Sequence, residues 1–147
     1  MPAICVTEPK STSLIASNKS YMAYMPAVLV AAGIAVLSLV EKAHAPAMPM
    51  GDKWSHGIAY CVLSLCLMAA LWFNSRTRWH WWLTAVLSCT AYGLLMEVLQ
   101  RFCTLTRSGE MADLLADFLG ALVGVAMVAI FCLVRHLVIS SSRHLEK

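Results

Sequence analysis

Residues 54–75 form a long apolar segment, WSHGIAYCVLSLCLMAALWFNS, in which His56 is the one Asp, Glu, Lys, Arg or His side chain. A helix rises about 1.5 Å per residue and the hydrocarbon core of a bilayer is about 30 Å thick, so about 20 consecutive apolar residues are needed to cross it. The segment meets that length. It therefore predicts a membrane-spanning helix.

Three further segments have the same character. Residues 20–40 carry no charge, whereas residues 79–96 reach spanning length only when Glu97 is included. The last uncharged run is 118–134, so a full span has to begin near residue 113 and contain Asp117. The fold class that we predict is an all-α, four-helix transmembrane bundle, with helices at about residues 21–40, 54–75, 79–100 and 113–136.

The composition excludes an ordinary soluble domain. Of 147 residues, 60% are apolar and 13% are charged, with a mean hydropathy of +0.71, whereas roughly a quarter of a typical soluble chain is charged. The net charge of +3 is spread along the chain without a basic stripe, so no nucleic-acid partner is expected. We predict a polar N-terminal tail over residues 1–20, one membrane domain over 21–139 and a C-terminal tail over 140–147.

The distribution of Lys and Arg predicts the orientation, because these residues favour the cytoplasmic side. Seven of them fall in the N-terminal tail, in the connection after the second helix and in the C-terminal segment, and four fall on the other side. Both termini are therefore expected in the cytoplasm.

Three ionisable residues lie at a matching depth in the predicted spans. The depth of each residue is its distance from the opposite end of its own helix, at a rise of about 1.5 Å per residue. His56, Glu97 and Asp117 each lie roughly 24 to 27 Å from that end. A lone charge that faces hydrocarbon costs several kcal/mol. We therefore expect the imidazole and the two carboxylates to face one another in an outward-facing polar pocket.

Polar and small residues recur on one face of each of these helices, as the helical repeat allows. The rows are Asp52, His56 and Tyr60; Gly93, Glu97 and Gln100; and Asp113, Asp117, Gly120 and Gly124. The small-xxx-small spacing of Gly120 and Gly124 predicts close packing of two helices, with Gly93 as the receiving surface.

The residue types in the expected pocket point to acid–base chemistry. An imidazole changes its charge near neutral pH and a carboxylate can accept its proton, so the candidate catalytic residues are His56, Glu97, Asp113 and Asp117. Substrate binding is assigned to Asp52, Lys53, Tyr60, Gln100 and Arg107, with Lys53 and Arg107 holding an anionic group. The sequence identifies no nucleophile and leaves open whether a reaction is catalysed.

A metal centre has little support from the sequence. Asp52, His56, Glu97 and Asp117 could supply ligands, but the chain has no HExxH, paired-cysteine or EF-hand spacing. No metal and no cofactor is therefore expected. A purely structural alternative is that Lys53, Arg101 and Arg107 neutralise the acidic residues in ion pairs at the helix ends.

Two ordered motifs resemble those of the VanZ-like family, small membrane proteins named after a protein associated with resistance to the glycopeptide teicoplanin. The first is Asp52-Lys53-x-x-His56-x-x-x-Tyr60. The second comprises Tyr92-Gly93, Glu97-x-x-Gln100, Arg107, Asp113, Asp117 and Gly120 to Gly124, and the resemblance covers about residues 51–128. Asp117 stands where the family usually has Asn.

The resemblance implies a multi-pass protein of the bacterial cytoplasmic membrane with a role in the cell envelope, and for some members altered glycopeptide susceptibility. The resemblance does not indicate which reaction, if any, the protein catalyses. The leading hypothesis is a pocket that binds, and can modify, an envelope lipid or a lipid-linked precursor through its anionic headgroup. The alternatives are a proton- or ion-coupled carrier and a non-catalytic subunit or scaffold, acting as a homo-oligomer or in a membrane complex.

Overall fold

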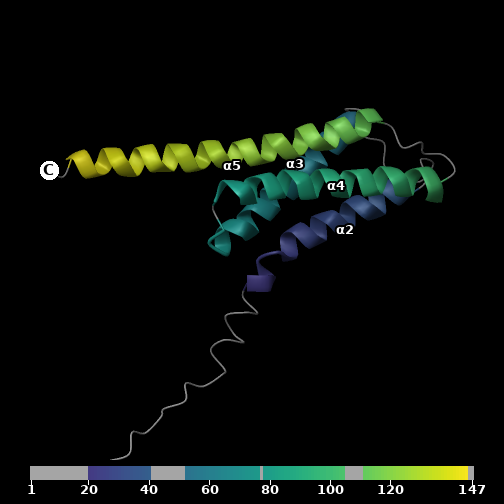
Figure 1. Ribbon diagram of the computed structural model, residues 1–147, viewed down its shortest axis with the longest axis horizontal. Helices are drawn as coiled ribbons and strands as arrows, with labels where there is room; N and C mark the ends of the chain where they lie inside the picture. Colours follow the sequence, from purple (N-terminus) through teal and green to yellow (C-terminus); the bar gives the residue numbers. More distant parts are fainter. Residues whose placement is uncertain (1–19, 41–51, 77, 105–110, 146–147) are drawn as a thin grey trace, which may run out of the picture.

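The computed structural model describes residues 20–40, 52–76, 78–104 and 111–145, and these segments are helical with no strand among them. The helices are α2 (Met25–Leu39), α3 (Asp52–Phe73), α4 (Trp79–Cys103) and α5 (Met111–Leu145) (Figure 1). Four helical stretches, over residues 20–39, 53–73, 79–103 and 111–141, are long and apolar enough to cross a membrane. The predicted all-α, four-helix transmembrane class is confirmed, and the protein is a multi-pass membrane protein.

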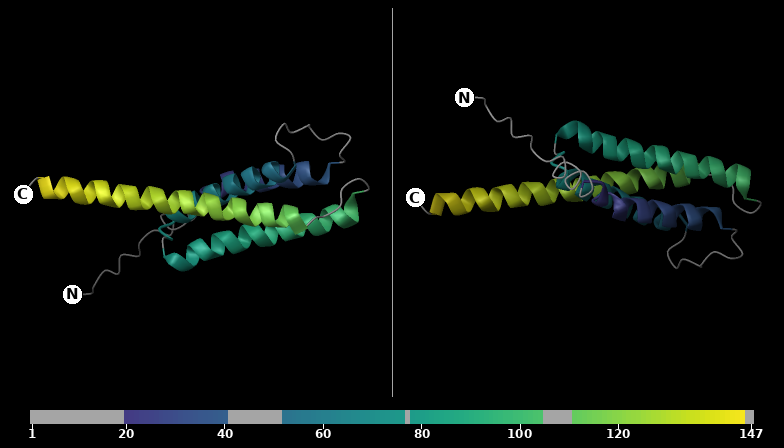
Figure 2. Two further views of the ribbon diagram at one scale, coloured as in Figure 1. Left: turned by 90° about the horizontal axis from the view of Figure 1, so that it is seen from above. Right: turned by 90° about the horizontal axis from the view of Figure 1, so that it is seen from below.

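The helices alternate in direction, so the two ends of the bundle differ. The N-terminal ends of α3 and α5 lie together with the C-terminal ends of α2 and α4 (Figures 1 and 2). We call this the polar end, because it holds the acidic residues and the histidine discussed below. The most extensive helix contact is between α3 and α5; α4 packs on α5 and α3, and α2 packs on α3 and α4.

Glycines allow α3 and α5 to approach closely. A Cβ atom at Gly120 would overlap the backbone of Gly57, and one at Gly124 would overlap the Ser64 hydroxyl and approach the Cys61 carbonyl oxygen. The prediction that Gly93 receives these glycines was wrong. The receiving surface is the small-residue face of α3, because the space beside Gly93 is filled by the carboxylate of Asp117.

Hydrogen bonds attach α2 to α4. The Tyr92 hydroxyl donates to the carbonyl oxygen of Ala31 at 2.7 Å, and the Gln100 side-chain amide donates to the carbonyl oxygen of Ser38 at 3.0 Å. Both acceptors are backbone carbonyls of α2. The side chains of α4 therefore determine how α2 is positioned along the bundle.

Helix α5 is longer than the sequence predicts. The sequence predicts an end near residue 136 and a tail from residue 140, but the helix continues to Leu145 and extends past the other helices (Figures 1 and 2). No Gly or Pro follows Gly124, so nothing in the sequence interrupts the helix. At a rise of about 1.5 Å per residue the 35-residue helix is roughly 52 Å long, more than a bilayer core requires.

The close approach of α3 and α5 yields a stability prediction. Gly120→Ala places a methyl group against the Gly57 backbone and should lower the free energy of unfolding by about 1–3 kcal/mol, because the helices must separate. Thermal unfolding in detergent micelles measures the loss. Gly33→Ala is the matched control, since a Cβ there meets nothing within 4 Å. Equal melting temperatures for the two variants would contradict the packing described above.

Candidate functional site

A histidine and two carboxylates from three helices meet at the polar end. His56 of α3 has its Nδ1 atom 2.9 Å from Oδ1 of Asp117 on α5 and 4.0 Å from Oε1 of Glu97 on α4. The Asp117 side chain is fully buried, and those of His56 and Glu97 are 10% and 8% exposed. We call these three residues the His–Glu–Asp cluster.

Local sequence explains why the cluster forms. His56 lies one turn from the start of α3, and the Gly57 that follows it lets α5 come close. A Cβ at Gly93 would lie 2.6 Å from Oδ2 of Asp117, so α4 leaves room for this carboxylate only because residue 93 has no side chain. Glu97 is one turn further along α4 and therefore faces the same space.

The cluster has hydrogen-bonding capacity that its described neighbours do not use. Oδ2 of Asp117 and the hydroxyl of Tyr60 are both buried and have no hydrogen-bond partner among the described residues. Tyr60 lies one turn beyond His56 on the same face of α3, and its ring is 6.3 Å from that of Tyr92. Buried polar groups without partners are costly, so the site is suited to receive a further polar group.

A lysine lies above the cluster, nearer the end of the bundle. Lys53 Nζ is 3.4 Å from Oδ1 of Asp113, and the lysine side chain is 57% exposed while that of Asp113 is 9% exposed. Lys53 and Asp113 each precede a cluster residue by about one helical turn. The ammonium group of Lys53, which is exposed at the surface of the bundle, is thus positioned next to the buried polar groups.

The predicted site residues are only partly brought together. His56, Glu97 and Asp117 form the cluster, Tyr60 lies one turn deeper in α3, and Lys53 and Asp113 pair at the rim. Gln100, a predicted substrate-binding residue, donates a hydrogen bond from its side-chain amide to the Ser38 carbonyl oxygen of α2. Arg107 and the side chain of Asp52 lie outside the described residues. Gly57 is not among the predicted site residues, although its spacing with Cys61 and Ser64 indicates a small-residue surface on α3.

The cluster offers two kinds of chemistry. One imidazole nitrogen and a carboxylate oxygen from each acid lie within 4.8 Å of one another, which is close enough to hold a metal ion. The 2.9 Å contact between His56 and Asp117 also allows a proton to be shared or transferred between the two groups.

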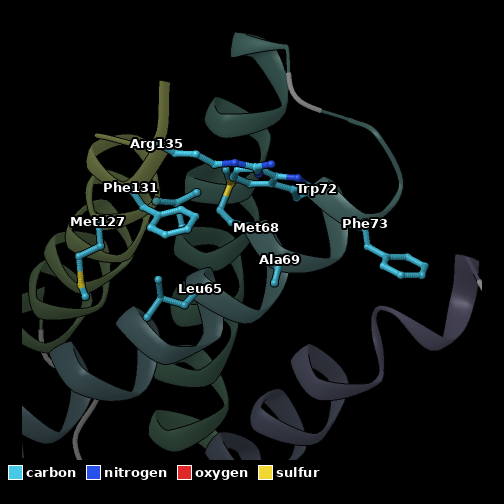
Figure 3. Close-up of a pocket in the computed structure, with 9 residues that line it drawn as sticks. Leu65, Met68, Ala69, Trp72, Phe73, Met127, Phe131 and Arg135 are labelled. Atoms are coloured by element: carbon cyan, nitrogen blue, oxygen red, sulfur yellow. The ribbon is translucent and has the colours of Figure 1, made fainter. Parts of the chain in front are cut away.

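An apolar groove lies in the other half of the bundle. This groove of about 600 Å³ runs between α3 and α5 and is lined by apolar residues such as Leu65, Met68 and Phe131 (Figure 3). At its end the Arg135 guanidinium lies 5.8 Å from the centre of the Trp72 ring. The lining holds no carboxylate or histidine, so the groove lacks the acid–base groups of the polar end.

Comparison with known proteins identifies the family. A family model described as VanZ/LLP1 matches residues 44–133, which is more than half of the chain. The protein therefore belongs to the VanZ-like family, and the resemblance found in the two motifs is confirmed. The matched segment contains every member of the His–Glu–Asp cluster. No curated protein and no solved structure gives a significant match.

The contact between His56 and Asp117 should couple the two residues energetically. His56→Ala leaves a buried carboxylate without its partner and should cost about 3 kcal/mol of unfolding free energy. Asp117→Ala removes the same contact, so the double variant should lose less than the sum of the single losses, with a coupling of about 1–3 kcal/mol. The free energy of unfolding is measured in mixed micelles for the parent protein, the two single variants and the double variant.

The ion pair of Lys53 and Asp113 at the rim provides a comparison for this coupling energy. Because Lys53 is largely exposed, the same cycle with Lys53→Ala and Asp113→Ala should give a coupling below about 1 kcal/mol. Additive losses for His56 and Asp117 would mean that their contact does not contribute to stability.

Proposed function

Because membership of the VanZ-like family suggests a role in the cell envelope, we propose that this protein binds the anionic headgroup of an envelope lipid or lipid-linked precursor at its polar end. One observation carries the proposal: a buried His56–Asp117 hydrogen bond lies below the exposed cation of Lys53. This combination provides a charged entrance and a polar interior within one membrane protein.

Lys53 is paired with Asp113 and the cluster below it holds two carboxylates, but two features at the rim of the polar end favour an anion there. Lys53 is an accessible cation, and the N-terminal ends of α3 and α5 point to the same end of the bundle (Figure 2). A helix N-terminus carries a partial positive charge and unsatisfied N–H groups, which favour a phosphate or carboxylate nearby. The lysine and the two helix N-termini therefore provide attraction for a headgroup at the rim, whereas Glu97 and Asp117 lie deeper in the bundle.

The His–Glu–Asp cluster would act on the bound group by proton transfer. Nδ1 of His56 contacts Asp117, so the ring orientation is held and the second ring nitrogen is left to exchange a proton with a ligand. Glu97 would serve as the second acid–base group. Because no nucleophile is identified, the chemistry proposed ends at proton transfer to or from the headgroup.

The orientation and the cellular role belong to the same proposal. The larger number of Lys and Arg residues on the side of the termini supports cytoplasmic termini and a polar end that faces outward from the bacterial cytoplasmic membrane. A change in an outward-facing lipid or precursor would then alter susceptibility to a glycopeptide such as teicoplanin.

A carrier is less well supported than a lipid-binding protein. Away from the polar end, α3 and α4 are joined by an apolar core of Met68, Leu71 and Ala85, with Trp81 and Trp82 packed against it. These described residues offer no polar path along which a proton or an ion could continue. The polar groups therefore suit a ligand that approaches from one side.

Lipid binding can be tested with the purified full-length protein. Lys53→Gln should weaken binding of phosphatidylglycerol about tenfold, because a charge-assisted contact contributes about 1.5–3 kcal/mol. Native mass spectrometry with phosphatidylglycerol and phosphatidylcholine measures the affinities. Arg135→Gln, at the opposite end of the bundle, is the matched control for loss of a positive charge. An equal effect of both substitutions would argue against a headgroup site at the polar end.

A cellular test addresses the chemistry. His56→Ala and Glu97→Gln should abolish the effect of the protein on envelope lipid composition and on teicoplanin susceptibility, whereas His136→Ala, an exposed histidine on α5, should behave as the parent. Lipid mass spectrometry and inhibitory concentrations are the measurements, normalised to the amount of protein in the membrane. A phenotype that follows protein abundance alone would favour the scaffold alternative.

A further inference from the structure

We infer that the His–Glu–Asp cluster binds a divalent transition-metal ion and that Zn²⁺ matches its donors best. The inference does not rest on the proposed headgroup site, because an ion can be held between the three helices whether or not a lipid is bound above it. Sequence motifs do not predict this site, since the ligands come from three separate helices at no recognised spacing.

The distances between the donor atoms suit a single ion. Nδ1 of His56 lies 2.9 Å from Oδ1 of Asp117 and 4.0 Å from Oε1 of Glu97, and one donor atom from each residue fits within 4.8 Å. Zn²⁺ binds nitrogen and oxygen at about 2.0–2.2 Å, so neighbouring donors around it are roughly 3–4 Å apart. Side-chain rotation alone can therefore bring the three donors to one ion.

The chemical types of the donors select the metal. Ca²⁺ and Mg²⁺ prefer shells made entirely of oxygen, whereas an imidazole nitrogen together with carboxylates is suited to Zn²⁺ and its neighbours. Three protein ligands also leave at least one coordination position open, as in zinc sites that bind water or a substrate oxygen. A headgroup phosphate held by Lys53 could occupy that position.

Charge balance favours an occupied site. Two carboxylates and a neutral imidazole together carry a charge of −2, which a divalent ion cancels. The Asp117 side chain is fully buried and those of His56 and Glu97 nearly so, and uncompensated charge at such a position is costly. At the rim, the opposite charges of Lys53 and Asp113 compensate each other.

Unsatisfied polar atoms provide an independent indication of a ligand. The second carboxylate oxygen of Asp117 and the Tyr60 hydroxyl are buried without a hydrogen-bond partner in the described part of the chain. Tyr60 lies one helical turn beyond His56 on the same face of α3. A metal ion with its coordinated water would give these atoms a coordinating or hydrogen-bonding partner, and groups behind the ligands commonly orient them in this way.

Metal binding can be measured on the full-length protein in detergent micelles, without added lipid. After removal of metals with a chelator, the parent protein should bind one Zn²⁺ per chain, measured by elemental mass spectrometry and by competition with a chromophoric chelator. Zn²⁺ should also raise the melting temperature, whereas Mg²⁺ at the same concentration should not. Failure to bind one equivalent of Zn²⁺ above the level of a buffer blank would overturn the inference.

Variants determine whether the ion lies in the cluster. Asp117→Asn retains the shape of the side chain but not its charge, and it should weaken Zn²⁺ binding at least tenfold, as should His56→Gln. His136→Ala and Cys103→Ala, both at exposed positions, should leave the affinity unchanged. Unchanged binding in Asp117→Asn and His56→Gln, or loss of binding in Cys103→Ala, would overturn the assignment.

Two further measurements distinguish binding in the cluster from binding at a cysteine and from a loss of folding. The absorption spectrum of the Co²⁺-substituted protein should lack thiolate-to-metal charge transfer, and its presence would overturn the cluster assignment. Circular dichroism tests whether each variant keeps its helices. The Zn²⁺ stoichiometry of the parent protein tests metal binding even if a variant does not fold. Headgroup affinity measured after chelation, in the parent and in Lys53→Gln, tests the proposed function separately.

Discussion

A carboxylate that cannot face lipid is the constraint on which the arrangement of helices depends. Asp117 lies within a membrane-spanning helix and its side chain is fully buried, so α5 must turn this face toward other helices. His56 of α3 supplies the hydrogen bond, and α4 supplies the space beside Gly93. The relative rotation of three helices is therefore set by one polar side chain and the groups that surround it.

Packing and polarity reinforce each other along the same stripe of α5. Gly120 lies almost one turn after Asp117 and Gly124 lies one turn further, and both contact α3 through its backbone and small side chains. Close contact of the two helices brings Asp117 within hydrogen-bond distance of His56. The glycines therefore contribute to the site although they carry no reactive group, because without them the two side chains would be separated.

The two halves of the bundle have different properties, and this difference shapes the functional proposals. The polar end combines an exposed cation with buried groups that can bind a proton or a metal, whereas the other half has an apolar core and an apolar groove with Arg135 at its end (Figure 3). The proposed headgroup site lies at the polar end, away from Arg135, within an otherwise apolar membrane protein. This supports a lipid or a lipid-linked molecule more than a small soluble substrate.

The number of spans and the depth of their polar residues could be predicted from the residues alone, because hydropathy reports length and the constant rise of a helix converts residue number into depth. The sequence also indicates which face of each helix is polar. Which faces meet became clear only from the packing of the four helices: α3 rather than Gly93 receives the glycines of α5, and Gln100 donates a hydrogen bond to α2. Helical periodicity defines a direction around one axis, whereas the identity of the neighbour depends on how all four helices pack together.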